Sequence, residues 1–314
     1  MKGLHIDTIY PKLIRSVLDK GVKSSPRGMG VKEIFNVGFK LEDARNSIIT
    51  NPHRKINYAY AAIEMLGNFR HGDKNVEPFC FYVPRMKQYL NPETNTWDGS
   101  YATRLQLYNQ LPKMYEVLRA DPSSRQAVIS FYNPAHDFHD YQSNDICCTL
   151  SLIFCLREGK LNLTCTMRSN DVFLGLPYDL TQFTFLQSVL ACWLGVEVGG
   201  YYHFTANLHA YEQDWEKLEI IASEPWPAGE ALLPTMPTWD IPDIEKTYIN
   251  IEKFFSLEKS TRQNQLNGAD CESTVLREIF LNIIGPAINK KLSLDFSEKV
   301  RHNVIPNKAE RLKT

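Results

Sequence analysis

The sequence contains no long apolar run, no surplus of charge of either sign and no two cysteines at CxxC spacing. Its 35 Lys and Arg residues nearly balance 36 Asp and Glu residues and leave a formal net charge of −1. Because a duplex-DNA binder needs a basic surface to neutralise phosphates, this balance argues against that class of protein. With 43% hydrophobic and 23% charged residues, the composition is that of a folded chain. Chemistry on small molecules remains the open class.

Targeting signals are also scarce. The beginning of the chain has no continuous apolar region, and Asp7 lies within it, which argues against a secretory signal. The most apolar later stretch, residues 183–198, is interrupted by Gln187 and Ser188 and is shorter than the ~20 residues that span a membrane. Seven cysteines form an odd set, which predicts free thiols instead of a disulfide framework. We therefore expect a cytoplasmic protein with no membrane partner and no direct contact with nucleic acid.

Helix and strand patterns alternate along most of the chain. Residues 7–20 and 57–69 have helical periodicity, and VKEIFNVGF at 31–39 is typical of a strand. Two apolar runs flank Glu158-Gly159-Lys160, which predicts a β-hairpin with glycine at the tight position. A further helix is expected over residues 180–195, where it ends at a glycine.

The composition changes after residue 222. Residues 223–242 hold five prolines, too many for a helix or a central strand, and predict an extended linker that wraps the main body. Residues 244–258 and 272–291 again have helical periodicity. The length exceeds that of a typical domain of about 100–200 residues. We therefore expect a main domain over residues 1–222 and a Pro-rich linker with a helical extension over residues 223–314.

Three short segments carry residues suited to catalysis: Cys147-Cys148 at the opening of a predicted strand, RSND at 168–171, and NLHAY at 207–211. The stretch RSNDVFLGLPYDLTQFTFLQ resembles the R-S-x-D-V-F-L-G-x-P-F-N-I segment of the thymidylate synthase superfamily. AAIEMLGNFRHGD, SYATR, DPSSRQAVISFYNP and LHAYEQ are similar to further segments of that family, in the same order. The resemblance runs from about residue 7 to residue 215. It implies an α+β fold, with a large mixed β-sheet flanked by helices and followed by the C-terminal helical extension.

The resemblance also implies roles for the matched residues. Cys148 would be the nucleophile and Glu64 the proton shuttle, and Tyr101 and Asp179 would complete the catalytic group. The nucleotide would be bound by Arg27, Arg125, Arg168, Ser169, Asn170, His209 and Tyr211. Asp171 would hold the pterin ring of the co-substrate, 5,10-methylenetetrahydrofolate. Because an arginine of this family reaches across a two-fold axis, the resemblance implies a homodimer with Arg125 contributed across the interface. Gln126 replaces the second arginine of the family's D-S-R-R motif and removes one cation.

Residue chemistry supports the same interpretation. The C5 atom of a pyrimidine is too weak a nucleophile to attack a one-carbon electrophile, whereas addition of a thiolate to C6 makes C5 carbanion-like. Such a thiol must ionise near neutral pH, and a neighbouring guanidinium lowers its pKa. Arg168 lies on the strand that the hairpin pairs with that of Cys148, and it is suited to this task. Cys147 would point to the opposite face and serve packing.

Two departures from the family pattern bear on the substrate. Asp179 stands where uracil-specific members carry asparagine, whereas the deoxycytidylate hydroxymethylases of this superfamily carry aspartate. A carboxyl group can accept from N4–H of cytosine and, when protonated, donate to N3. The alternative is that Asp179 caps a helix that starts near Leu180. Thr149 follows the nucleophile where methylating members carry histidine, and the smaller side chain would make room for the water that yields a hydroxymethyl product.

These features predict folate-dependent 5-hydroxymethylation of a cytidine monophosphate, with dCMP as the first candidate. A CMP hydroxymethylase, a C5-methylase of dCMP or dUMP, and a catalytically silent homologue that binds nucleotide are the alternatives. No metal is expected. The run His136-Asp137-Phe138-His139-Asp140 lacks a further ligand at metal spacing and is interpreted as a polar loop.

Overall fold

The computed structural model describes residues 4–138, 143, 145–223, 226, 233–265 and 271–292. Its framework is a seven-stranded sheet in the order β1-β2-β7-β5-β4-β3, with β6 beside β7. β7 pairs in parallel with β5 and β6, and the other pairs are antiparallel, so the sheet is mixed. The strands are β1 (Val22–Ser24), β2 (Val31–Leu41), β3 (Val128–Ser130), β4 (Thr149–Arg157), β5 (Lys160–Met167), β6 (Asn170–Asp171) and β7 (Glu197–Tyr211).

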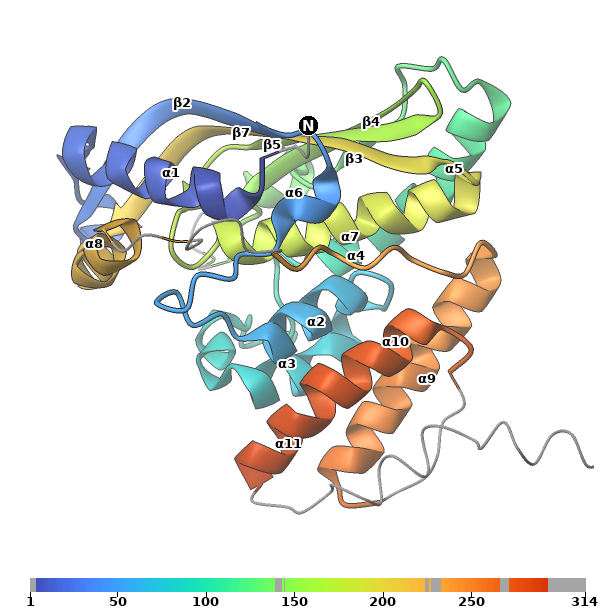
Figure 1. Cartoon of the computed structure of the whole chain (residues 1–314). Helices are drawn as coiled ribbons and strands as arrows, with labels where there is room; N and C mark the ends of the chain where they lie inside the picture. The colour runs from blue at the N-terminus through green and yellow to red at the C-terminus, as the bar shows by residue number, and fades with distance from the viewer. Residues whose placement is uncertain are drawn as a thin grey trace, which may run out of the picture.

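The helices lie beneath one face of this sheet, and in the described part of the chain no helix covers the other face (Figure 1). They are α1 (Ile6–Lys20), α2 (Tyr58–Gly67), α3 (Val76–Tyr82), α4 (Tyr101–Leu107), α5 (Gln110–Ala120), α6 (Pro134–Asp137), α7 (Leu176–Leu194), α8 (Trp215–Ser223), α9 (Ile244–Arg262), α10 (Thr274–Ile279) and α11 (Gly285–Leu292), the last two joined by a π-helical turn (Phe280–Ile284). The predicted α+β class, with a mixed sheet flanked by helices, is confirmed. Within these ranges no helix is both long enough and apolar enough to cross a membrane.

α7 is the central helix of the molecule. It packs against β5 and β7 on one side and against α2 on the other, so almost every side of it is buried. A helix that is apolar all round is expected in such a position between two layers. Three layers result: the sheet, then α7, then α2 and α3 with α9 to α11 against them (Figure 1).

The predicted hairpin is confirmed, and one helix start is corrected. β4 and β5 are joined by Glu158 and Gly159, both with positive φ (51° and 70°), as in a two-residue turn of the type that matches strand twist. The predicted helix over 180–195 starts earlier, at Leu176, because Pro177 occupies its first turn. Asp179 therefore lies inside the helix, and the alternative that it caps a helix starting near Leu180 is wrong.

The C-terminal extension shares the core of the main domain. Residues 233–243 run along α7 (Figure 1), and Trp239 is only 2% exposed there. The Trp239 backbone N–H donates to Oγ of Ser188 in α7 (2.9 Å), and its indole packs edge-on against Phe185. The indole N–H donates to Thr247 of α9 (3.2 Å). Residues 224–225, 227–232, 266–270 and 293–314 of the predicted linker and extension lie outside the described residues.

Replacing Trp239 by alanine should destabilise the whole chain, because it empties a packed site between α7 and α9. We expect the free energy of unfolding to fall by about 3–5 kcal/mol in urea titrations followed by circular dichroism. Ile249→Ala, on the exposed side of α9 (46% exposed), is the control and should stay within about 0.5 kcal/mol of the original chain. Equal effects of the two variants would show that the extension is not part of the cooperative core.

Candidate active site

Adjoining cavities meet at Cys148. One of about 210 Å³ is lined by Glu64, Tyr101, Cys148 and Asp179. A second, of about 640 Å³, contains Arg27, Cys148, Arg168, Ser169, His209 and Tyr211. A third, of about 380 Å³, touches both groups and adds Asn170 and Asp171. The fold thus brings every predicted site residue to one place except Arg125. Arg125 is exposed beside β3, at the end of the sheet order, and lines none of these three cavities.

Strand pairing fixes the cation beside the thiol. Cys148 immediately precedes β4, and the Arg168 N–H donates to the Cys148 carbonyl (2.9 Å), which continues the β4–β5 pairing. The Arg168 guanidinium donates to the carbonyl oxygens of Cys147 (2.8 Å) and Ile146 (2.9 Å), and its Nη2 lies 3.6 Å from Cys148 Sγ. Burial raises the pKa of the Cys148 thiol, and the Arg168 charge opposes this without reversing it. The expected net lowering of this pKa is therefore not found in the free protein.

Two carboxyl groups face the thiol from different helices. Glu64 of α2 is bonded through Oε1 by the Tyr60 hydroxyl (3.1 Å), and its buried Oε2 has no partner among the described residues. Burial, together with the neighbouring Asp179 charge, raises the pKa of Glu64 to about 8. Glu64 therefore lines the cavity and carries a proton near neutral pH; it is not a solvent-facing helix carboxylate.

Asp179 projects from the first turn of α7 into the same cavity and is 7% exposed. Its oxygens accept from Asn170 Nδ2 (2.7 Å) and Gln182 Nε2 (3.2 Å). Burial raises its pKa to about 7 in spite of these bonds. A carboxyl group with this pKa can both donate and accept near neutral pH, which is the pattern that the N3 and N4 edge of cytosine requires.

A chain of polar contacts fixes the ring of His209. Glu33 of β2 lies opposite His209 of β7 in the sheet register, and its carboxylate accepts from Asn207 Nδ2 (2.8 Å). The side-chain oxygen Oδ1 of Asn207 then lies 3.1 Å from His209 Nδ1, so this nitrogen carries the hydrogen and Nε2 is left as an acceptor. Burial lowers the pKa of His209 to about 4, so the ring is neutral. A neutral ring with a free acceptor nitrogen suits a sugar hydroxyl.

Arg27, Ser169 and Asp171 also line these cavities. Arg27 is exposed in a turn, with φ 53°. Its side chain and that of Arg168 both line the larger cavity and bring two positive charges to it. Ser169 Oγ lies 3.3 Å from His209 Nδ1. Asp171 Oδ1 accepts from the N–H groups of Phe173 (2.7 Å) and Leu174 (3.1 Å), which closes the turn before α7, and burial raises its pKa to about 6.

The sequence interpretation missed several residues of the site. Glu33, Asn207 and Tyr60 were given no role. Tyr60 bonds Glu64 and Asn207 bonds His209, and Glu33 in turn accepts from Asn207. Thr149 does not line the cavities that meet at Cys148: it is fully buried, and its hydroxyl donates to Tyr101 (2.7 Å). Asp137, from the histidine- and aspartate-rich run, forms a buried ion pair with Arg104 (2.7 Å). His139 and Asp140 of that run lie outside the described residues.

The fold and this arrangement of cysteine, arginines and carboxyl groups agree with the family comparison. The family model described as thymidylate synthase matches residues 8–259. The chain belongs to the thymidylate synthase family. The resemblance inferred from the sequence motifs is confirmed, and the match continues past residue 222 into α9.

Curated relatives carry the name deoxyuridylate hydroxymethyltransferase. The chain is 33% identical to such a protein of Bacillus phage SP01 over 66% of its own length and 57% of the relative. It is 33% identical to one of Pseudomonas phage M6 over 48% of its length and 44% of the relative. It is 27% identical to one of Delftia phage PhiW-14 over 70% of its own length and 64% of the relative. The chain thus spans about half to two-thirds of the length of these relatives.

Replacing Glu64 by glutamine should change how stability depends on pH. The folded protein keeps the Glu64 proton up to about pH 8, whereas the unfolded chain releases it near 4.5. Between these values the folded state binds more protons, so this group lowers the free energy of unfolding as the pH rises. We expect this free energy to fall less steeply with pH in Glu64→Gln across that window, by urea titration. Asp179 should leave a residual slope, because its pKa is also raised, from 3.8 to about 7.

The control for this measurement is Glu216→Gln, an exposed glutamate of α8, which should keep the slope of the original chain. A Glu64→Gln slope equal to that of the control would show that Glu64 is ionised in the folded protein.

Proposed function

We propose that the protein transfers a one-carbon unit from 5,10-methylenetetrahydrofolate to C5 of a pyrimidine nucleoside monophosphate, with dCMP as substrate and 5-hydroxymethyl-dCMP as product. One observation carries this proposal. The Cys148 thiol lies where a cavity with the buried carboxyl groups of Glu64 and Asp179 meets a cavity with Arg27 and Arg168. A base fits the first and a phosphate the second, because arginine forks match phosphate oxygens.

The polar groups around Asp179 support cytosine as the base. Asp179 is protonated below about pH 7 and can donate to N3 while it accepts from N4–H. Next to it, the buried Asn170 Oδ1 has no partner among the described residues. The N4 amino group of cytosine has two hydrogens to donate, whereas uracil presents an oxygen there. Buried acceptors that stay unpaired are costly, so the site favours the amino-bearing base.

The proposed reaction assigns a step to each group. Cys148 gives up its proton to water, with Arg168 stabilising the thiolate, and adds to C6, so that C5 becomes nucleophilic. C5 then attacks the one-carbon unit of the co-substrate. The C5 proton passes through water to Glu64 in its ionised form, and the carbon–nitrogen bond to the folate breaks, which releases tetrahydrofolate and leaves an exocyclic methylene on C5. Water adds to the exocyclic methylene, and expulsion of the thiolate from C6 restores the aromatic ring. Glu64, with its raised pKa, is suited to move protons in both directions near neutral pH.

A hydroxymethyl product needs space for the attacking water. The Thr149 hydroxyl points to Tyr101 and not into the cavity, so no large side chain follows Cys148 into this space. For the co-substrate, the cavity that contains Asp171 also has apolar walls, including Leu174, Tyr178 and Met86. A flat ring with polar edges fits an apolar slot that ends in a carboxyl group. Asp171 would hold that ring.

The second candidate is dUMP hydroxymethylation, which the names of the phage relatives favour. Two assays separate the candidates. Incubation with methylenetetrahydrofolate and dCMP, CMP or dUMP tritiated at C5 should release tritium fastest from dCMP, and the mass of the product should show an added hydroxymethyl group. A methyl product would indicate a C5-methylase. Absence of release from all three nucleotides would indicate a catalytically silent homologue.

Asp179→Asn should shift base preference toward uracil, because the amide donates where the carboxyl group accepts. We expect the ratio of kcat/KM for dCMP over dUMP to fall by about 10²-fold or more, as for other sites that read buried hydrogen bonds. Asp73→Asn, an exposed aspartate, is the control and should leave the ratio unchanged. If Asp179→Asn retains the cytosine preference, Asp179 does not read the base.

We also propose that two copies of the chain pair through the bare face of the sheet. Phe35, Tyr202 and Phe204 of β2 and β7 are large hydrophobic residues that are 59%, 38% and 38% exposed. Apolar strand surfaces of this kind mark interaction sites. Arg125, exposed beside β3 and away from its own cavities, would then complete the phosphate site of the partner.

Sharing of sites predicts complementation between two inactive variants. Cys148→Ala and Arg125→Ala chains should each lose activity, Cys148→Ala completely. Co-refolded together, they form mixed dimers in which one site keeps both residues, so about a quarter of the original activity should return, since half of randomly paired dimers are mixed. A mixture no more active than the sum of the separate variants would place Arg125 outside the partner's site.

A further inference from the structure

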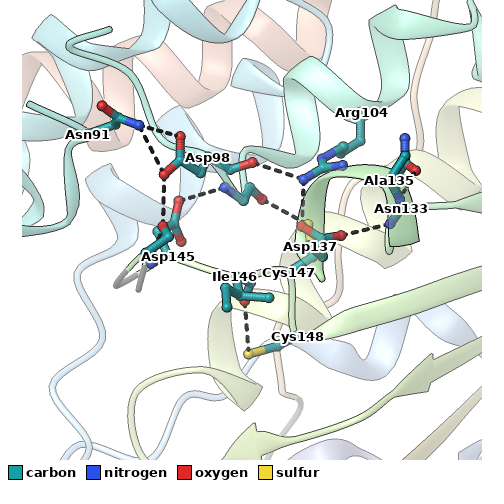
Figure 2. A network of polar contacts seen from close by, with 12 residues as sticks. Asn91, Asp98, Arg104, Asn133, Ala135, Asp137, Asp145, Ile146, Cys147 and Cys148 are labelled. Carbon is teal, nitrogen blue, oxygen red and sulfur yellow. Dashed lines mark hydrogen bonds and ion pairs between the residues drawn. The ribbon is translucent and has the colours of Figure 1, made fainter. Parts of the chain in front are cut away.

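Gly99 lies two residues before Tyr101. Both its backbone N–H and its carbonyl oxygen form hydrogen bonds with the segment that carries Cys148. Its N–H donates to Asp145 Oδ2 (2.9 Å), and its carbonyl accepts from Cys147 Sγ (3.2 Å). Figure 2 shows Asp145, Cys147 and Cys148 following one another along this segment. A Cβ at position 99 would lie 3.0 Å from the Asp145 carbonyl oxygen and 3.1 Å from the Cys147 nitrogen. Any other residue at position 99 would push this segment away by a few tenths of an ångström, so glycine allows the closest approach.

A second attachment lies on the other side of the nucleophile. Thr149 directs both its backbone N–H (3.3 Å) and its hydroxyl (2.7 Å) to the Tyr101 hydroxyl oxygen. A phenol oxygen accepts two hydrogen bonds and donates one. With both acceptor positions filled by Thr149, the Tyr101 proton is free to point elsewhere, and Tyr101 lines the same cavity as Cys148, Glu64 and Asp179.

A polar network, buried at the Arg104–Asp137 pair, holds the loop that precedes α4. Arg104 of α4 pairs with Asp137 (2.7 Å) and also donates to the Asp98 carbonyl (3.0 Å). The Asp98 carboxylate accepts from Asn91 (3.0 Å) and Ser143 (2.7 Å). In Figure 2, Asp98 lies beside Asp145, and Arg104 points to Asp137. The backbone at residues 98–101 is therefore fixed from the side of α4 as well.

We propose that Asp145, Cys147 and Thr149 are positioning residues for Tyr101. Asp145 and Cys147 hold the backbone at Gly99, on one side of the nucleophile, and Thr149 holds the Tyr101 hydroxyl from the other side. Together they direct this hydroxyl, as a donor, toward the reacting end of the pyrimidine. The proposal rests on the proposed function. It gives the adjacent cysteines different tasks: Cys148 reacts, and Cys147 holds the backbone that leads to Tyr101. Burial raises the pKa of the Cys147 thiol to about 12, so it stays protonated and remains a donor.

The kinetic test uses variants that remove one hydrogen bond without changing size. Thr149→Val keeps the shape of the side chain and loses its hydroxyl, and Thr149→Ser restores the hydroxyl. We expect Thr149→Val to lower kcat for tritium release from dCMP about 10–100-fold, with KM changed less than about 3-fold, as for a misaimed catalytic group. Thr149→Ser should recover most of the rate. The control is Thr181→Val, whose hydroxyl bonds only its own helix at Pro177.

Cys147 is tested in the same manner. Cys147→Ala removes the donor to Gly99, and Cys147→Ser supplies another, so serine should restore kcat where alanine lowers it. A kcat that is unchanged in both Thr149→Val and Cys147→Ala would overturn the proposal. So would a pure rise in KM, or a loss that tracks lower thermal stability and that serine fails to rescue.

A second readout is independent of turnover. Hydrogen–deuterium exchange at the Gly99 amide should be slow in the original chain, about 10-fold or more faster in Asp145→Ala, and slow again in Asp145→Asn, which keeps an acceptor oxygen. Equal exchange in all three proteins would overturn the attachment itself. Failure of the original chain to release tritium from any nucleotide, with exchange as expected, would overturn the proposed function and with it the catalytic role of the attachment.

Discussion

The pairing of β4 with β5 is the constraint on which the site depends. Cys148 and Arg168 are the last residues before β4 and the first after β5, and the Arg168 N–H donates to the Cys148 carbonyl. The tight turn at Glu158 and Gly159 sets the register of the hairpin as far as Ser151. A register shift between Thr149 and Ser151 then brings Cys148 opposite Arg168. A further slip by one residue would turn the side chains of one strand to the other face and separate the guanidinium from the thiol. A hairpin with one irregularity thus places a cation beside the nucleophile.

The acidic groups of the site favour their protonated, uncharged forms. Burial raises the pKa of Cys148, of Glu64 to about 8 and of Asp179 to about 7. The three groups share one cavity, so the ionisation of one raises the pKa of the others, and they titrate as a set. When the carboxyl groups of Glu64 and Asp179 are neutral, ionisation of the Cys148 thiol is easier, because the nearby charge of Arg168 is then not opposed by a negative charge. Binding of a nucleotide that keeps Asp179 protonated would lower the cost of ionising Cys148.

Local patterns predicted the parts of the site that depend on neighbours in sequence. The hairpin, the start of β2 and the helix α2 follow from apolar spacing and from turn residues. The start of α7 was placed four residues late, although Pro177 is a favoured residue in the first turn of a helix. Contacts across long sequence separations could not be predicted. Asn207 meets Glu33 only because β2 pairs with β7, and Tyr101 meets Thr149 only after α4 folds against the sheet.

The layered packing connects the extension to the chemistry. Glu64 lies on α2, which packs against α7, α3 and the π-helical turn Phe280–Ile284 between α10 and α11. In the same layer, Glu258 of α9 accepts from the Tyr82 hydroxyl of α3 (3.0 Å) and from Arg262 (2.6 Å). The helix that carries Glu64 is therefore supported partly by residues beyond 222. Burial raises the pKa of Glu64 to about 8, and that burial depends on the packing of α2. The composition change at residue 223 thus marks a change of local structure, whereas the packing that holds the site extends across it.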